Sequence, residues 1–443
     1  MDLHNTRSLL TAIGLAVCSL QAQSVEPGYR TASVIPLPPG TGQVTVLDGD
    51  AGVVWFDGTR LVLRDASGAQ RELLSFGSPV FGSFSLQVGP TEVLFGESSN
   101  GDLWLVSTVP NGRAPRLLAN LPANFDATQM DADAVLVSAK TGGYTTPDND
   151  IVHVDLVTGG TQLVARVDGA SGPLTWTRNG LYYATASLSF PPPPGAVEVL
   201  LWTPLQIQQN LGNRVLTAAD AIQVATGIDS AWGLAVDSDF DLIVSDWLNG
   251  TVHEVSIGFR AGRNEVVRRS DLIDYDPTAP QPLGIRWRGG PPWSGQFEPF
   301  QPSDAGALIV HESTFGGASQ IRRLVPARPV TSAPMNAPAG PFDVVTTGGP
   351  ALGTGLVAVG PNPRQNEGPY PVPGFEQMIL WDPTMFFAWD VLAVSFDANG
   401  TATLPLFNPG IGGSGSQIGM QCAFVDAQGQ VIGSAAPITV GLR

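Results

Sequence analysis

The sequence predicts an all-β protein, a six-bladed β-propeller followed by a small β-sandwich. The chain of 443 residues contains 52 Gly and 38 Pro, and only 14% of its residues are charged. This composition is typical of many short strands joined by turns. Hydrophobic residues make up 43% of the chain, which is too many for a disordered protein. Strand-like runs also recur at roughly the 45 to 50 residues that a four-stranded propeller blade needs.

The first residues have the features of an export signal. A basic residue precedes the apolar residues 8–20, and a small-residue cleavage site lies before Ser24. We assign residues 1–23 to a signal peptide and expect a secreted or cell-envelope protein. Cys18 lies in a weak match to a lipoprotein box, but the bulky Val17 before it argues against lipidation. No other apolar run is long enough to span a membrane.

Six candidate blades follow within residues 32–328. The first five each contain four strand-like runs separated by turn residues. The sixth has only three, and we expect Ala32 to Leu37 to supply the fourth by pairing with the strand near Ser319 to Val325. Such a closure removes the open edges of the ring. Two insertions break the period. Pro191 to Pro194 predict an exposed loop, and the aromatic residues of loop 289–304 either plug a neighbouring surface or form a binding platform.

The C-terminal part has a different pattern. A Pro/Ala-rich stretch at 329–341 is the expected linker. Residues 342–443 lack the blade period but contain paired strand-like runs with Gly-containing turns, which predict a β-sandwich. They look like the C-terminal β modules of secreted and surface proteins of bacteria. Cys422 is the only cysteine outside the predicted signal, and its apolar surroundings predict a buried thiol without a disulfide.

The clearest blade runs from Ala231 to Ser256. Residues 231–236, 242–246 and 251–256 read as strands joined by an Asp-Ser-Asp turn and by Asn249-Gly250. This order resembles an NHL-type repeat and the blades of the gluconolactonase and senescence-marker-protein group. The resemblance covers this blade well and the others weakly. It implies a six-bladed propeller whose channel holds a divalent metal through Glu, Asn and Asp, and the metal would assist lactone or ester hydrolysis.

One mouth of the channel would be formed by the ends of the second strands and the approaches to the first strands. Converging carboxylates there suit a hard cation such as Ca²⁺. We assign the candidate metal ligands as Asp126, Asp246 and Glu312. The other candidate residues of the channel mouth are Asp57, Glu97, Lys140, Trp232 and Gln281. The alternative is that the carboxylates are solvated loop residues or turn caps.

The remaining chemistry-bearing residues form no recognisable catalytic motif. The same position in third strands is occupied by His153, His253, Trp104 and Arg322, which indicates a structural position between blades. His311 is the one histidine that we consider for a site. Serine-hydrolase elbows, phosphate loops and zinc motifs are absent from the sequence, so no catalytic residue is assigned.

Three functions stay open. The first is an exported, non-catalytic propeller that binds a small molecule, a glycan or a protein. The second is a divalent-metal-dependent lactonase or esterase, which requires at least three carboxylates around one cation. The third is a carbohydrate-binding propeller, which requires a cluster of exposed tryptophans. The formal charge of −17 disfavours nucleic acid as a partner.

Overall fold

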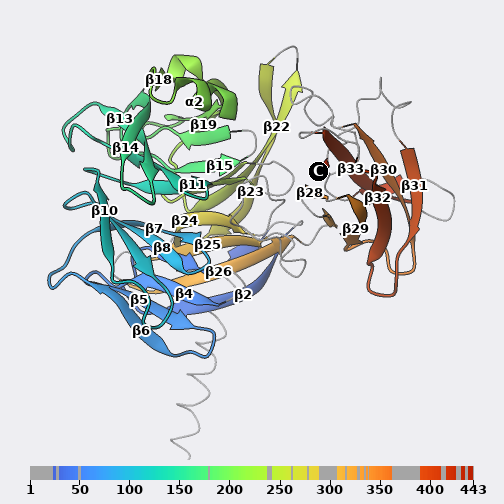
Figure 1. Ribbon diagram of the computed structural model, residues 1–443, viewed down its shortest axis with the longest axis horizontal. Helices are drawn as coiled ribbons and strands as arrows, with labels where there is room; N and C mark the ends of the chain where they lie inside the picture. Colours follow the sequence, from blue (N-terminus) through green and yellow to red (C-terminus); the bar gives the residue numbers. More distant parts are fainter. Residues whose placement is uncertain are drawn as a thin grey trace, which may run out of the picture.

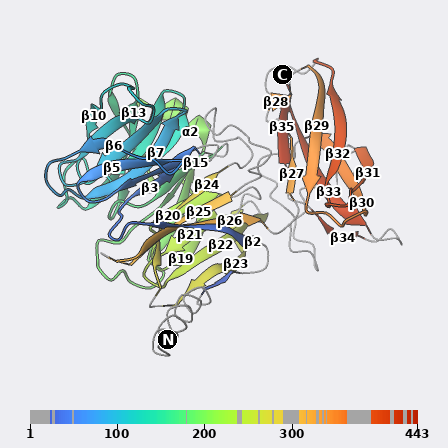
Figure 2. The same ribbon diagram turned by 90° about the horizontal axis from the view of Figure 1, so that it is seen from below.

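The computed structural model describes residues 23–25, 29–47, 51–177, 180–236, 242–260, 263–276, 279–288, 307–314, 317–326, 330–333, 336–337, 339–361, 390–410, 416–425, 431–434 and 438–442. This part of the chain is nearly all β, and it forms a large group of sheets and a smaller C-terminal group (Figures 1 and 2). Residues 1–22 of the predicted signal and the loop 289–304 lie outside the described residues. No helix in the described ranges is both long and apolar enough to cross a membrane.

Within the described residues, six sheets make up the larger group, and their strands pair antiparallel except for one short parallel edge strand at Leu216–Thr217. The first two sheets are β3 (Val44–Val46), β4 (Gly52–Phe56), β5 (Arg60–Asp65) and β6 (Gln70–Ser75), and then β7 (Gly82–Gly89), β8 (Glu92–Glu97), β9 (Asp102–Ser107) and β10 (Arg116–Asn120). The next two are β11 (Asp126–Asp131), β12 (Ala134–Ala139), β13 (Asp148–Asp155) and β14 (Thr161–Asp168) with β18 (Leu216–Thr217) at the edge, and β15 (Leu174–Thr177), β16 (Gly180–Ala184), β17 (Val197–Trp202) and β19 (Ile222–Ile228). The last two are β20 (Gly233–Val236), β21 (Leu242–Asp246), β22 (Thr251–Arg260) and β23 (Arg263–Tyr275) with β1 (Gln23–Val25), and β24 (Gln281–Arg288), β25 (Ala307–Ser313), β26 (Ser319–Pro326) and β2 (Tyr29–Leu37).

The N-terminal segment completes the last sheet, as the sequence predicts. β2 pairs antiparallel with β26, with Tyr29 opposite Pro326 and Leu37 opposite Ser319. The strand begins three residues earlier than the predicted boundary at residue 32. β1 also pairs with β23 and extends the fifth sheet. The first described residues of the chain therefore supply the edge strands of the fifth and sixth sheets.

Apolar side chains fill the spaces between neighbouring sheets, and this packing closes the ring. Leu37 and Ile309 of the sixth sheet pack with Val53 and Trp55 of the first. Other clusters join the second sheet to the third and the fourth to the fifth. Contact of the last sheet with the first gives the propeller-type arrangement seen in Figure 1.

One helix interrupts the fourth sheet. α2 (Pro204–Asn210) lies between β17 and β19. Thr203 caps its N-terminus in a capping box with Gln206, and Pro204 is its first residue. Ile207 is buried and anchors the helix on the third and fourth sheets.

The C-terminal residues form two sheets around a shared apolar layer. The first sheet contains β27 (Val330–Ser332), β29 (Gly340–Thr347) and β32 (Ala402–Asn408). The second contains β28 (Asn336–Ala337), β35 (Ile438–Leu442), β33 (Ser416–Val425), β30 (Thr354–Pro361) and β31 (Asp390–Ser395), with β34 (Val431–Ser434) beside β33. β27 and β28 lie within the predicted linker 329–341, so this stretch contributes to both sheets. Cys422 is free and fully buried in this layer, as predicted.

Candidate ligand-binding site

A cavity of about 440 Å³ lies at the centre of the six sheets. Each sheet contributes to its wall through its first strand or the loop that leads into it. Examples from the first to the sixth sheet, one for each, are Val44, Ser83, Asp126, Ser171, Trp232 and Arg286. The cavity therefore lies inside the ring of sheets, against the first strands and the loops that lead into them.

Exposed apolar side chains surround the opening of this cavity. The residues that combine large apolar side chains, high exposure and a place in the cavity wall are Phe81, Tyr144, Leu188, Phe190 and Leu248. Phe190 is 77% exposed and Phe81 is 60% exposed. Phe190 directly precedes the proline run, so the predicted exposed loop lies over the cavity. Such a concentration of exposed apolar surface at a concave site marks a binding surface.

An aromatic row lines one wall of the cavity. The ring centroids of Phe125 and Trp232 lie 5.9 Å apart in an edge-on arrangement, and those of Trp232 and Trp247 lie 5.4 Å apart. Phe125 leads into β11, and Trp232 leads into β20. Edge-on and tilted contacts of this kind hold the rings in place. The wall thus offers a preformed surface for a flat apolar group.

An ion pair joins opposite sides of the ring at the cavity. Arg286 of β24 forms a bidentate pair with Asp126 of β11, residues that lie 160 positions apart. Leu174 of β15 donates its backbone N–H to the same carboxylate at 3.0 Å. The Asp126 carboxylate is buried and is already neutralised by the guanidinium group, so it lacks the free charge that a cation ligand needs.

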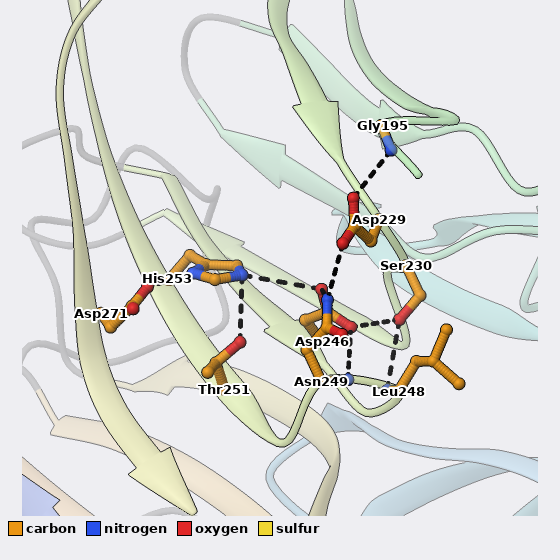
Figure 3. A network of polar contacts seen from close by, with 9 residues as sticks. All are labelled: Gly195, Asp229, Ser230, Asp246, Leu248, Asn249, Thr251, His253 and Asp271. Atoms are coloured by element: carbon orange, nitrogen blue, oxygen red, sulfur yellow. Dashed lines mark hydrogen bonds and ion pairs between the residues drawn. The ribbon is translucent and has the colours of Figure 1, made fainter. Parts of the chain in front are cut away.

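Asp246 lies at the centre of a separate polar network at the end of β21 (Figure 3). It accepts hydrogen bonds from Ser230 Oγ at 2.5 Å and from Asn249 Nδ2 at 2.9 Å. His253 Nε2 lies 3.6 Å from its Oδ2 atom, and His253 Nδ1 lies 2.6 Å from Asp271 Oδ1. Burial acts to raise the pKa of Asp246, but the hydrogen bonds outweigh it, and the pKa lies below its ordinary value.

Glu312 is buried with a basic partner of its own at the end of β25. Its carboxylate accepts hydrogen bonds from Arg322 Nε at 2.5 Å, Gln320 Nε2 at 2.5 Å and Tyr275 Oη at 2.7 Å. Burial, followed by the charge of Glu312, raises the pKa of Tyr275 well above its ordinary value. Glu312 is therefore part of a satisfied buried ion pair.

The metal site predicted from Asp126, Asp246 and Glu312 is not formed. Each carboxylate belongs to a different sheet and is bound by different protein donors. Within the described ranges, no three His, Cys, Asp or Glu residues are arranged to hold a metal ion. The sequence analysis recognised strand ends correctly, but the partners of these carboxylates come from other strands of the fold.

The five residues predicted at the channel mouth divide into two groups. Lys140 and Trp232 line the cavity. Asp57 and Glu97 instead cap the turns that follow them, accepting backbone N–H groups from Thr59 and Asn100 respectively. The Gln281 side chain donates to the carbonyl groups of Asp276 and Ala279 and also lies off the cavity. Asp57 and Glu97 therefore act as turn caps, which is the alternative that the sequence left open for the carboxylates.

Several cavity residues were not predicted as site residues. Arg286 lies mid-strand, and only the closed ring places it opposite Asp126. Phe81, Tyr144 and Phe190 precede or follow strands in loops with no periodic pattern. The sequence does mark these three residues, because each of them is an aromatic residue in a loop on the predicted mouth side.

The comparisons with known proteins give distant likenesses. No family model and no curated protein matches the sequence. A gluconolactonase structure from Xanthomonas campestris is 12% identical, covers 68% of this chain and 95% of its own, and has a TM-score of 0.42. A virginiamycin B lyase structure from Staphylococcus aureus is 8% identical, covers 67% of this chain and 99% of its own, and has a TM-score of 0.38. A streptogramin B lyase structure is 12% identical, covers 70% of this chain and 99% of its own, and has a TM-score of 0.36. These values are too low to assign an activity.

Proposed function

We propose that this chain is an exported six-bladed β-propeller, followed by a β-sandwich, whose channel mouth binds a small and largely apolar ligand with a planar group. The main support for this function is the ring of exposed apolar side chains around a cavity of about 440 Å³. This volume is in the range of small-molecule sites, which combine apolar walls with a few polar groups. The polar groups here include serine hydroxyls and Lys140.

Binding of a neutral hydrophobic fluorophore tests this function. We expect N-phenyl-1-naphthylamine to bind saturably, and Trp232→Ala to raise its Kd at least tenfold because the substitution removes the centre of the aromatic wall. Phe407→Ala is the matched control, since Phe407 is 70% exposed on β32 and lies off the cavity. Equal affinities of the wild type and the Trp232→Ala variant would refute the proposed site.

The lactonase or esterase function stays a prediction drawn from the resemblance of residues 231–256. It requires a cation held by residues other than the three already bound to protein donors. Thermal unfolding in EDTA and then in excess calcium separates the two functions. A rise in Tm that saturates with calcium would show native-state metal binding and favour the hydrolase. An unchanged Tm would leave the binding function as the better proposal. Saccharides that compete with the fluorophore would identify the ligand class as carbohydrate.

A further inference from the structure

The only lysine of the chain lies in the wall of the central cavity. Lys140 follows β12 and is 4% exposed. Its backbone is fixed on both sides, because its N–H donates to Pro122 O at 2.9 Å and its carbonyl accepts from Gly143 N at 2.7 Å. The other basic side chains in the wall are Arg286 and His311. Lys140 is therefore the one lysine among the residues that line this cavity.

No described carboxylate forms an ion pair with this amine. The Nζ atom donates a hydrogen bond to the carbonyl of Thr146. Asp150 of β13 is instead bound by Arg166 Nε at 2.7 Å and by the Thr141 hydroxyl. Burial lowers the pKa of Lys140, and the charges of Asp148 and Asp150 oppose this effect. A larger share of neutral amine makes a lysine more nucleophilic.

Three other titratable side chains of the wall already have protein partners. Arg286 is held by Asp126. His311 is buried with Nε2 3.0 Å from Ser319 Oγ, and burial lowers its pKa to about 4. The Tyr144 hydroxyl is bound to Ser98. The aromatic residues in the wall of the same cavity favour flat apolar groups.

We propose that Lys140 captures aldehyde or ketone ligands, aromatic aldehydes above all, as an imine in this cavity. The inference rests on the proposed binding function. The Nζ lone pair forms a bond to the carbonyl carbon, and the carbonyl oxygen takes up a proton. Loss of water from this carbinolamine then gives the C=N bond. The water carries the carbonyl oxygen and two amine hydrogens, so the step needs no oxidant or reductant. Capture is reversible by hydrolysis.

Reductive trapping tests the proposal on the full mature chain. Benzaldehyde with sodium cyanoborohydride at pH 7 converts an imine into a stable benzylamine that peptide mass mapping locates. We expect benzylation of Lys140 in the folded protein and none at position 140 in Lys140→Arg, which keeps the charge but not the amine. The double variant Arg60→Lys, Lys140→Arg supplies an exposed amine beside Asp57, since the Arg60 side chain is 52% exposed and pairs with Asp57.

The expected result is that Lys140 reacts at least tenfold faster than the lysine introduced at position 60, and that urea removes this difference. Excess fluorophore should also protect Lys140. Equal rates in the folded proteins would overturn the inference. If the fluorophore binds and Trp232→Ala weakens it, equal rates refute imine capture alone. If Lys140 reacts rapidly but the fluorophore does not bind, the binding function fails instead.

Discussion

At the scale of single residues, two of the buried carboxylates contact side chains of the adjacent strand. Asp246 ends a second strand and meets His253 of the third strand, and Glu312 meets Arg322 in the same way. His253 and Arg322 are two of the residues that the sequence analysis placed in a common structural position. That position was predictable from the repeat, but its charge partners were not, because they depend on strand register.

His311 should make the free energy of unfolding depend on pH. Burial lowers its pKa from 6.5 to about 4. The unfolded chain therefore binds more protons than the folded chain between these values, and stability falls as pH falls through this window. The full loss is about 3 kcal/mol. We expect His311→Gln to reduce the difference in unfolding free energy between pH 7 and pH 4.5, measured by urea denaturation. Identical differences in both proteins would contradict this assignment.

At the scale of secondary structure, local capping chemistry decides where α2 begins. The helix has seven residues, of which Ile207 is the buried one, so it shows no amphipathic period. The sequence nevertheless contains a usable signal, because Thr203-Pro204 with Gln206 is a capping box with proline at the first helical position. The capping residues therefore predict this helix, whereas its hydrophobic periodicity does not.

Removal of this cap should destabilise the fourth sheet region measurably. Thr203 Oγ1 accepts the backbone N–H of Gln206 at 3.3 Å, and Gln206 Oε1 accepts the N–H of Thr203 at 2.8 Å. We expect Thr203→Ala to cost about 1 kcal/mol and to speed amide hydrogen exchange in α2. Thr203→Ser keeps the hydroxyl and is the matched control. Equal exchange rates in the alanine and serine variants would show that the cap does not hold the helix.

At the scale of the whole molecule, the sequence predicted the repeated strands better than the contacts between distant sheets. The period along the chain identified the strands of the ring and the pairing of β2 with β26. It could not place Arg286 opposite Asp126, because that contact arises only when the ring is closed. Of the residues singled out in the sequence, Asp126, Lys140 and Trp232 line the cavity, whereas Asp246 and Glu312 do not.

Closure of the ring by the N-terminal strand leads to the last prediction. β2 covers the edge of β26, and its Leu37 is buried against the first sheet. A mature chain that lacks residues 24–37 exposes this edge and loses both the ladder and the apolar contacts. We expect a loss of roughly 3 to 6 kcal/mol, with weaker fluorophore binding because both sheets beside the gap line the cavity. A chain that lacks only residues 24–28 loses β1 but keeps β2. This control separates the effect of ring closure by β2 from the effect of shortening the N-terminus. If both deletions unfold at the same urea concentration, β2 is not what holds the ring together.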